Sequence, residues 1–323
     1  VWFLEWSNDG NTLVSCGKDR SLIIWEFNSD SYSMTLFHKF SNAHDGDVNA
    51  ISISKDNRFI ATASSDKSIK IWEIQRKSQQ LEFKEHKDKV NAGIWGIQDE
   101  SLFSCGIDSQ LIHWRRDGSI IKSAKTSRCA DLQISSAFSQ LFLLSASSPE
   151  ISILNAESLD VVFKIQEKEP ILSFALSSNC LLLNTSLSKP ELHVYELDSK
   201  KLISILEGHQ QSNFMLKPSI GGLNSKLIAC GSEDGKVLVW HHSSTHPLLV
   251  NEAHTLAVNC VAWHPNIQHF LVSASDDCSI KLWVNSSLVE GLNDQENDEI
   301  VCLDDESDLE LEGVMGGGDG NGN

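Results

Sequence analysis

The sequence predicts an all-β protein, a β-propeller of seven blades, and three observations predict it. First, an apolar stretch ending in Trp recurs five times, each Trp six residues after an Asp, as in GSEDGKVLVW (231–240). Second, two further copies fit between these five, and the spacing is then 40 to 47 residues, close to the period of propeller blades. Third, apolar residues alternate at period two within each copy, which is typical of strands.

The blades can be numbered by the residue that ends the third strand of each repeat. Tryptophan holds five of the seven places, and Leu154 in SPEISIL and Tyr195 in KPELHVY hold the other two. The repeats predict one propeller domain over residues 1–285. Its seven landmark positions are Trp25, Trp72, Trp114, Leu154, Tyr195, Trp240 and Trp283.

Each repeat also contains an inner strand, such as 48–54, and a middle strand, such as 58–64. Turns rich in Asp, Asn and Gly separate them. Six outer strands are expected at 34–40, 80–84, 119–125, 161–165, 201–207 and 247–252. The seventh is expected from residues before Val1, with VNSSLV (284–289) as the weaker candidate. We therefore interpret the chain as an N-terminally truncated propeller that a preceding GH or RH turn and strand would stabilise.

Four repeats carry a His 28 to 31 residues before their Trp. With this pattern the sequence resembles the WD-repeat family of β-propellers, in which the His, a Ser or Thr, the turn Asp and the Trp share hydrogen bonds. A buried indole N–H needs such a partner. The resemblance implies a structural network made of His44, Asp66, Trp72, His86, Asp108, Trp114, His209, Asp234, Trp240, His254, Asp277 and Trp283, with Asp19 and Trp25 in the first repeat.

A Ser, His and Asp set also suggests a hydrolase, but a nucleophile is needed once and this set recurs. No G-x-S-x-G motif, phosphate loop or CxxC pair accompanies it. We therefore expect no catalytic residue, no metal site and no cofactor. The eight cysteines, among them Cys16, Cys105 and Cys230 in apolar strands, are interpreted as buried thiols in a reducing compartment.

The charge is concentrated at the C-terminus. The formal net charge is −18, of which −12 lies in residues 286–323 and −6 in the rest. An acidic body disfavours binding to nucleic acid or to an anionic membrane. Residues 286–323 are acidic and then Gly-rich, so we predict a disordered tail.

The repeats that depart from the common pattern indicate which group of WD-repeat proteins the sequence resembles. The fourth and fifth repeats lack the His and the turn Asp, and GGLNSKLIACGSEDGKVLVWHH (221–242) follows them. This order is similar to that of the WD-repeat subunit of the CTLH ubiquitin ligase, the glucose-induced degradation deficient complex of yeast. The resemblance implies a non-catalytic scaffold in the cytoplasm and nucleus. Its partners would be ligase subunits and substrates or regulators, and upstream LisH and CTLH segments would make it oligomeric.

The loops on the face of the His and Asp turns often bind partners in propellers. By position, the candidate contact residues are Lys18, Asp47, Ser65, Lys89, Ile107, Glu233 and Asp276.

Three alternatives stay open. In a receptor for a cullin-type ligase, an Arg often stands three residues after the Trp, but these places hold Asn28, Gln75, Asp117, Ser243 and Ser286. A scaffold in RNA processing or chromatin is the second alternative. An enzyme is the third.

Overall fold

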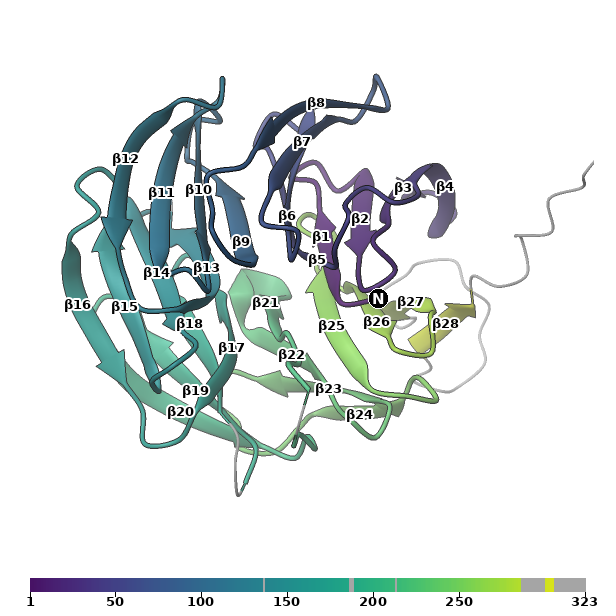
Figure 1. The fold of residues 1–323 in the computed structure, drawn as a ribbon. Helices are drawn as coiled ribbons and strands as arrows, with labels where there is room; N and C mark the ends of the chain where they lie inside the picture. The colour runs from purple at the N-terminus through teal and green to yellow at the C-terminus, as the bar shows by residue number, and fades with distance from the viewer. Residues whose placement is uncertain (136, 186–188, 213, 286–299, 305–323) are drawn as a thin grey trace, which may run out of the picture.

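Seven four-stranded antiparallel sheets surround a common axis in the computed structural model, which describes residues 1–135, 137–185, 189–212, 214–285 and 300–304 (Figure 1). The predicted seven-bladed β-propeller is therefore confirmed. Within these residues the only helix is the short 3-10 turn Leu223–Ser225, and none is long and apolar enough to cross a membrane.

Each blade is built from four consecutive strands, the first nearest the axis. Blades one to three contain β1 Phe3–Trp6, β2 Thr12–Cys16, β3 Leu22–Asn28, β4 Ser33–Phe40, β5 Val48–Ile53, β6 Phe59–Ser64, β7 Ile69–Glu73, β8 Ser78–Phe83, β9 Val90–Trp95, β10 Ser101–Gly106, β11 Gln110–Arg115 and β12 Ile120–Lys125. Blades four and five contain β13 Cys129–Ser135, β14 Gln140–Ser145, β15 Glu150–Asn155, β16 Val161–Gln166, β17 Ile171–Leu176, β18 Cys180–Thr185, β19 Glu191–Glu196 and β20 Lys201–Glu207.

Blades six and seven complete the ring. They contain β21 Ser219–Gly221, β22 Leu227–Gly231, β23 Lys236–His241, β24 Leu249–Glu252, β25 Val258–Trp263, β26 Phe270–Ser275, β27 Ile280–Asn285 and β28 Ile300–Asp304. All six outer strands expected from the sequence are present, with ends that differ by a few residues.

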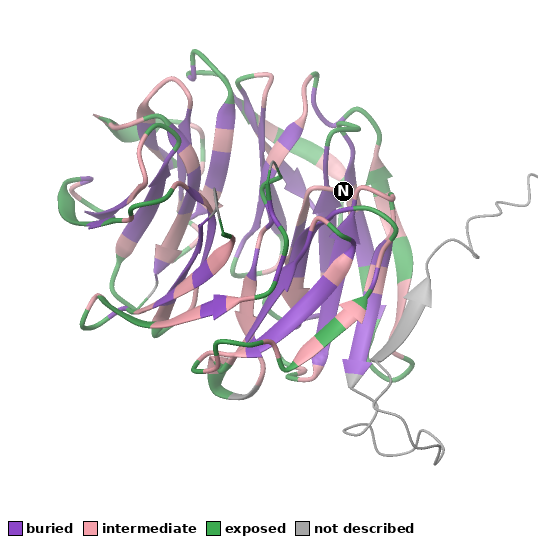
Figure 2. Cartoon of the chain, turned by 90° about the horizontal axis from the view of Figure 1, so that it is seen from below, coloured by how far each residue is buried: buried purple, intermediate pink, exposed green. Residues whose placement is uncertain are grey.

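The burial of each strand follows its place in the blade. The middle strand β6 is buried throughout, whereas the outer strand β12 is almost wholly exposed. Figure 2 shows buried strands inside the molecule and exposed segments at its periphery. In the third strand β7, Ile69 and Ile71 are buried on one face of the sheet and Lys70 is half-buried on the other. This alternation is the period-two pattern that the sequence shows.

The hydrophobic core lies between blades. In blades two and three, the Trp near the end of the third strand packs on the Phe that ends the outer strand of the preceding blade. Trp72 lies 4.6 Å from Phe40, and Trp114 is stacked 5.1 Å from Phe83 (distances between ring centroids). Each of these tryptophans therefore joins two blades, which explains why a bulky residue recurs at this position.

Blades one and seven meet through both the core and the backbone. The ring of Phe27 stacks on Phe270 at 4.8 Å, and Trp6 meets Phe27 edge-on at 5.4 Å. The amino group of Val1 donates to the Ser275 carbonyl at 3.1 Å. The first and last sheets are thus held side by side as neighbouring blades.

The outer strand of blade seven corrects the sequence prediction. It is β28, which pairs antiparallel with β27, with Cys302 opposite Trp283 in the backbone register. It comes neither from residues before Val1 nor from VNSSLV. Without this pairing the outer edge of β27 would leave its backbone groups without ladder partners, and the β-forming segment IVCLD supplies them. The rest of the predicted disordered tail, 286–299 and 305–323, lies outside the described residues.

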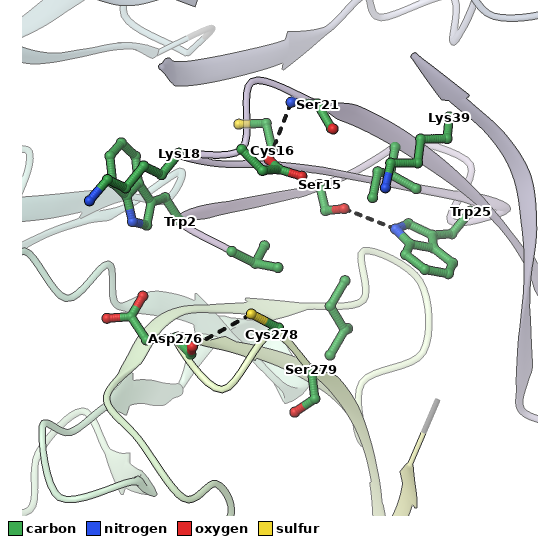
Figure 3. A pocket seen from close by; sticks show the side chains of 14 residues that line it. Trp2, Ser15, Cys16, Lys18, Ser21, Trp25, Lys39, Asp276, Cys278 and Ser279 are labelled. Carbon is green, nitrogen blue, oxygen red and sulfur yellow. Dashed lines mark hydrogen bonds between the residues drawn. The ribbon is translucent and has the colours of Figure 1, made fainter. Parts of the chain in front are cut away.

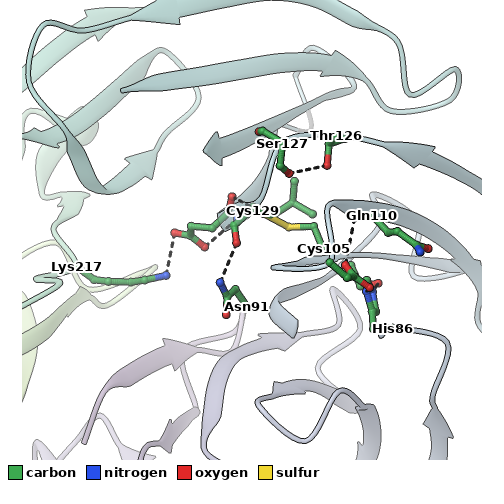
Figure 4. The surroundings of a disulfide bond; sticks show 12 residues. His86, Asn91, Cys105, Gln110, Thr126, Ser127, Cys129 and Lys217 are labelled. Carbon is green, nitrogen blue, oxygen red and sulfur yellow. Dashed lines mark hydrogen bonds and ion pairs between the residues drawn. A yellow bond between two sulfur atoms is a disulfide. The ribbon is translucent and has the colours of Figure 1, made fainter. Parts of the chain in front are cut away.

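The prediction that the cysteines are free thiols is wrong for one pair. Cys105 at the end of β10 and Cys129 at the start of β13 form a disulfide, with their Cα atoms 5.8 Å apart (Figure 4). The bond joins blades three and four. The sequence pattern did not reveal it because the two cysteines are brought together only by the packing of neighbouring blades.

The glycine of the SCG stretch lies where two backbones approach closely. A Cβ at Gly106 would be 2.2 Å from the carbonyl oxygen of Lys89, on the loop that enters β9. Backbone cannot yield as a flexible side chain does. We expect Gly106→Ala to lower the free energy of unfolding by about 1–3 kcal/mol in denaturant titration.

Gly93 provides the matched control, because a Cβ there would meet only side-chain carbons, the nearest at 3.5 Å. Gly93→Ala should stay close to the parent protein in stability. Equal losses for the two variants would contradict the assigned close approach at Gly106.

Candidate functional site

The predicted hydrogen-bond network is present in blade two, where it joins the loop before the blade to the turn inside it. His44 bonds the Asp66 carboxylate through Nδ1 at 2.8 Å and the Thr62 hydroxyl through Nε2 at 2.7 Å. The Trp72 indole N–H donates to the same hydroxyl at 2.9 Å. The backbone N–H of Asp45 also donates to Asp66, which holds the entering loop in place.

Blades three and seven repeat this arrangement. In blade three, His86 bonds Asp108 at 2.9 Å and Ser104 at 2.7 Å, and Trp114 donates to Ser104 at 2.7 Å. In blade seven, His254 bonds Asp277 at 2.9 Å and Ser273 at 2.8 Å, and Trp283 donates to Ser273 at 2.8 Å.

These networks are built for structure. Thr62, Ser104 and Ser273 are completely buried, so no substrate can reach their hydroxyl groups. Burial raises the pKa of Asp66, but hydrogen bonds from Ser68 and His44 outweigh it and lower the pKa to about 2. The geometry holds a carboxylate in its charged form and buries the hydroxyl groups that join the His to the Trp.

Blade one contains only part of the network. Trp25 donates to Ser15 at 3.0 Å, and Asp19 accepts the Ser21 N–H at 3.2 Å. No described His joins them. A cavity of about 660 Å³ between blades one and seven lies beside these groups (Figure 3), and it is lined by Trp2, Ser15, Lys18, Asp19, Ser21, Trp25, Asp276 and Cys278, among others.

Blade six corrects the sequence prediction, because His209, Asp234 and Trp240 do not form a network. Trp240 donates instead to the Glu207 carbonyl at 3.0 Å, and Asp234 pairs with Lys236 at 2.7 Å. His209 lies 3.3 Å from the Asn184 side-chain oxygen. The cause is Cys230, which occupies the place that Thr62 holds in blade two, so the hydroxyl that would join His and Trp is missing.

This difference predicts a pH dependence of stability. Burial lowers the pKa of His209 to about 4, whereas the unfolded chain keeps the ordinary value of 6.5. The unfolded state therefore binds a proton first as the pH falls, and stability is lost between pH 6.5 and 4. The full loss from this group approaches about 3 kcal/mol.

We expect His209→Gln, which retains a donor toward Asn184, to flatten the fall in unfolding free energy over this pH range in urea titrations. His246→Gln is the control, since His246 is exposed. If His209→Gln leaves the slope between pH 6.5 and 4 unchanged, the assigned burial of a neutral imidazole is wrong.

Blades four and five replace the network by other means. Leu154 is buried at the landmark position of blade four. In blade five, the Tyr195 hydroxyl donates to Glu167 at 2.7 Å, and His193 bonds the same carboxylate at 2.8 Å. Burial and this carboxylate together raise the pKa of Tyr195.

Sequence reasoning missed a set of asparagines that link the inner strands. The Asn49 amide donates to the Val90 carbonyl of the next blade at 2.8 Å, and Asn91 donates to Cys129 in the same way at 2.8 Å. Asn259 donates to Val1 at 3.1 Å. The repeated dipeptide Val-Asn at 48–49, 90–91 and 258–259 was the available signal.

The seven candidate contact residues all lie on the face formed by the His and Asp turns, here called the turn face. Lys18 and Lys89 are exposed, and Asp47 and Ile107 are half-buried.

The other three candidates hold the loops of the turn face in place. Ser65 bonds Asn49, and Asp276 accepts from Asn259 at 2.6 Å. The carboxylate of Glu233 accepts the backbone N–H groups of Ser212 and Phe214 at 2.7 and 2.9 Å. Glu233 therefore shapes the loop that enters blade six.

That loop carries the apolar part of the turn face, which sequence reasoning also missed. Phe214 and Met215 are large apolar side chains that are exposed by 45% and 47%. With Trp2 they line a cavity of about 470 Å³ at the mouth of the central channel, where Asn49, Asn91, Asn259 and Lys217 also lie. An apolar hollow with a few convergent polar groups is the usual form of a binding site.

Charged groups lie in the channel below this mouth. Lys217 pairs with Asp131 of blade four at 2.9 Å (Figure 4). Its ammonium lies 3.9 Å from the centre of the Phe3 ring. Burial raises the pKa of Glu5 to about 8, although the Ile53 N–H and Lys217 oppose the shift. No cluster that could hold a metal ion is found among the described residues.

Comparison with known proteins agrees with this architecture. The WD domain, G-beta repeat family matches residues 1–26, 34–73, 200–241 and 245–284. The chain is 31% identical over 292 residues to the WD repeat-containing protein WDS homolog of Arabidopsis thaliana, covering 88% of the chain and 55% of that protein.

Two further relatives align with most of the chain. The WD repeat-containing protein 26 homolog of Drosophila melanogaster is 31% identical over 292 residues, covering 88% of the chain and 45% of that protein. GID complex subunit 7 of Schizosaccharomyces pombe is 26% identical over 296 residues, covering 77% of the chain and 58% of that protein. The chain thus spans about half the length of the relatives it matches. It is a WD-repeat β-propeller, homologous to the WD repeat-containing protein 26 homologues.

Proposed function

We propose that the chain is the propeller of a non-catalytic subunit of a GID- or CTLH-type ubiquitin ligase, and that its turn face binds a protein substrate or regulator. The similarity to a protein named GID complex subunit 7 supports the choice of complex. Similarity to WD-repeat proteins over 88% of the chain supports a role in protein interaction.

The observation that carries the binding role is the channel mouth. Phe214 and Met215 are exposed beside a hollow of about 470 Å³, and hydrogen bonds to Glu233 hold their loop in a defined shape. A preorganised apolar surface loses little conformational entropy when it binds. Apolar patches of this kind on otherwise polar surfaces mark sites of protein interaction.

In this function the propeller contributes proximity and no reaction of its own. A substrate held on the turn face has its lysines near a ubiquitin-conjugating enzyme that a separate RING subunit recruits. The bound substrate then reacts at a high effective concentration. The buried hydroxyls of blades two, three and seven are consistent with this division of labour.

The other partners and the location belong to the same proposal. Helical LisH and CTLH segments outside residues 1–323 would join the subunit to the ligase and make it oligomeric. The complex would act in the cytoplasm and nucleus, without a cofactor and without contact to nucleic acid or membrane.

Co-purification tests the proposal. The full-length protein is tagged in its own cells, and its stoichiometric partners are identified by quantitative mass spectrometry. We expect RING and LisH–CTLH subunits to co-purify in constant ratio. Stoichiometric recovery of cullin, spliceosomal or histone-complex subunits in their place would overturn the assignment.

A further inference from the structure

The outer strands of blades three, four and five carry an apolar band that the fold does not need. Each strand has two consecutive exposed aliphatic residues at its first or second position, and the pairs are 41 positions apart from blade to blade: Ile120 and Ile121, Val161 and Val162, and Leu202 and Ile203. Their exposed fractions run from 43% to 54%. We call these six residues the rim band.

Blade two has polar residues at the equivalent position of its outer strand. Trp72 faces Gln79 in the register of blade two, as Trp114 faces Ile120 in blade three. Gln79 and Gln80 are exposed there. The same place in the same fold thus accepts amides, so folding does not require an aliphatic residue there. Blade one also has an exposed Leu36 opposite Trp25, but among the described residues only blades three to five have two consecutive exposed aliphatic residues 41 positions apart.

The band is continuous around the rim. β12, β16 and β20 follow one another along the outline of the molecule (Figure 1). Side chains join the neighbouring blades at this level: the Lys122 ammonium bonds the Ser158 carbonyl of blade four at 2.5 Å. The Lys200 ammonium of blade five lies 4.4 Å from the Phe163 ring of blade four.

The three outer strands themselves carry a positive charge, although Lys164 is paired with Glu150 at 2.9 Å. The three strands hold Lys122, Lys125, Lys164 and Lys201, with Glu207 as their single acid. The whole chain has a net charge of −18. An apolar band flanked by lysines complements a partner whose apolar stripe is flanked by carboxylates.

The topology separates this band from the turn face. The residues of the band follow directly after the turn between the third and fourth strands, which lies at the opposite end of the blade from the Asp turn. A partner on the band therefore leaves the channel mouth open.

We infer that the rim band binds an acidic amphipathic helix of another protein. A helix presents one unbroken apolar stripe with charged flanks, which suits a convex rim with one apolar pair per blade. This goes beyond the proposed function and does not depend on it: the chain has two binding surfaces and can join two partners.

The test uses the chain 1–323 and two designed 21-residue helical peptides with the same Leu stripe, one with Glu and one with Lys on its flanks. Binding is followed by fluorescence anisotropy. We expect the Glu peptide to bind and the Lys peptide to bind at least tenfold more weakly. Raising the salt concentration should weaken the binding of the Glu peptide, because salt screens the attraction between its carboxylates and the lysines.

The paired variants are Ile121→Glu with Val162→Glu on the rim band, and Gln79→Glu with Gln80→Glu at the same register in blade two. The first pair should lower the affinity for the Glu peptide at least tenfold, and the second pair should leave it unchanged. All four residues are exposed, so circular dichroism should show the parent fold in both variants.

Three results would overturn the inference. They are no binding of the Glu peptide, equal binding of both peptides, and equal effects of the two variants. Sedimentation of the parent chain adds a fourth: a dimer that Ile121→Glu with Val162→Glu abolishes would assign the band to a second copy of the chain. None of these results bears on the turn face.

Discussion

Trp114→Ala should lower the free energy of unfolding by about 3–5 kcal/mol, as expected for a large buried aromatic residue. Trp114 is 1% exposed, stacks on Phe83 of the preceding blade and donates to Ser104. Removing it opens a cavity between two blades and leaves the Ser104 and His86 network without its indole donor. Denaturant titration followed by circular dichroism measures the loss.

Trp114→Phe separates the two contributions. It retains a ring against Phe83 and loses only the indole N–H, so we expect a loss well below that of the alanine variant. If both variants lose less than about 1 kcal/mol, Trp114 is not wedged between blades, and the propeller packing described above is wrong.

Lys217→Met should have an effect of similar size, about 3–5 kcal/mol, for an electrostatic reason. Lys217 and Asp131 are 2.9 Å apart, and their side chains are 14% and 5% exposed. Without the ammonium, the Asp131 carboxylate stays buried in the channel, with the Leu132 N–H as a remaining donor. Thermal and urea unfolding both measure the loss.

The double variant Lys217→Met with Asp131→Asn provides the control, because it removes the unpaired charge together with its partner. We expect it to recover part of the stability that the single variant loses. If single and double variants are equally stable, the pair is not coupled, and the two channel walls are held together by other contacts.

Local pattern was sufficient to predict the fold. The alternation in KSIKIW depends on neighbouring residues alone, and the return of Trp every 40 to 47 residues is visible in the sequence as a repeat. Together they indicated seven blades with strands close to those observed. Blades two, three and seven contain the predicted network because each has all four of its residues, as in His44, Thr62, Asp66 and Trp72.

The errors had two causes. In blade six the sequence contains the cause itself, because Cys230 stands where the hydroxyl that joins the His and the Trp is needed, and the pattern of His, Asp and Trp alone did not include that position. The disulfide of Cys105 and Cys129 and the pairing of β28 with β27 depend on contacts between segments that no local pattern relates. Phe214 and Met215 were missed because an exposed apolar pair in a loop has no periodic signature.

The central claim is that the turn face binds the substrate or regulator of the complex. Its most direct test compares two variants of the full-length protein, Phe214→Asp with Met215→Asp on the turn face and Phe138→Asp on the opposite face. Phe138 is likewise exposed, by 40%, in the turn between β13 and β14.

The measurement is the amount of each partner recovered by quantitative mass spectrometry after purification of the tagged protein. We predict that the turn-face variant loses a substrate or regulator that the parent and Phe138→Asp proteins retain, while the ligase subunits remain in constant ratio. Recovery of every partner at equal levels from both variants would contradict the account.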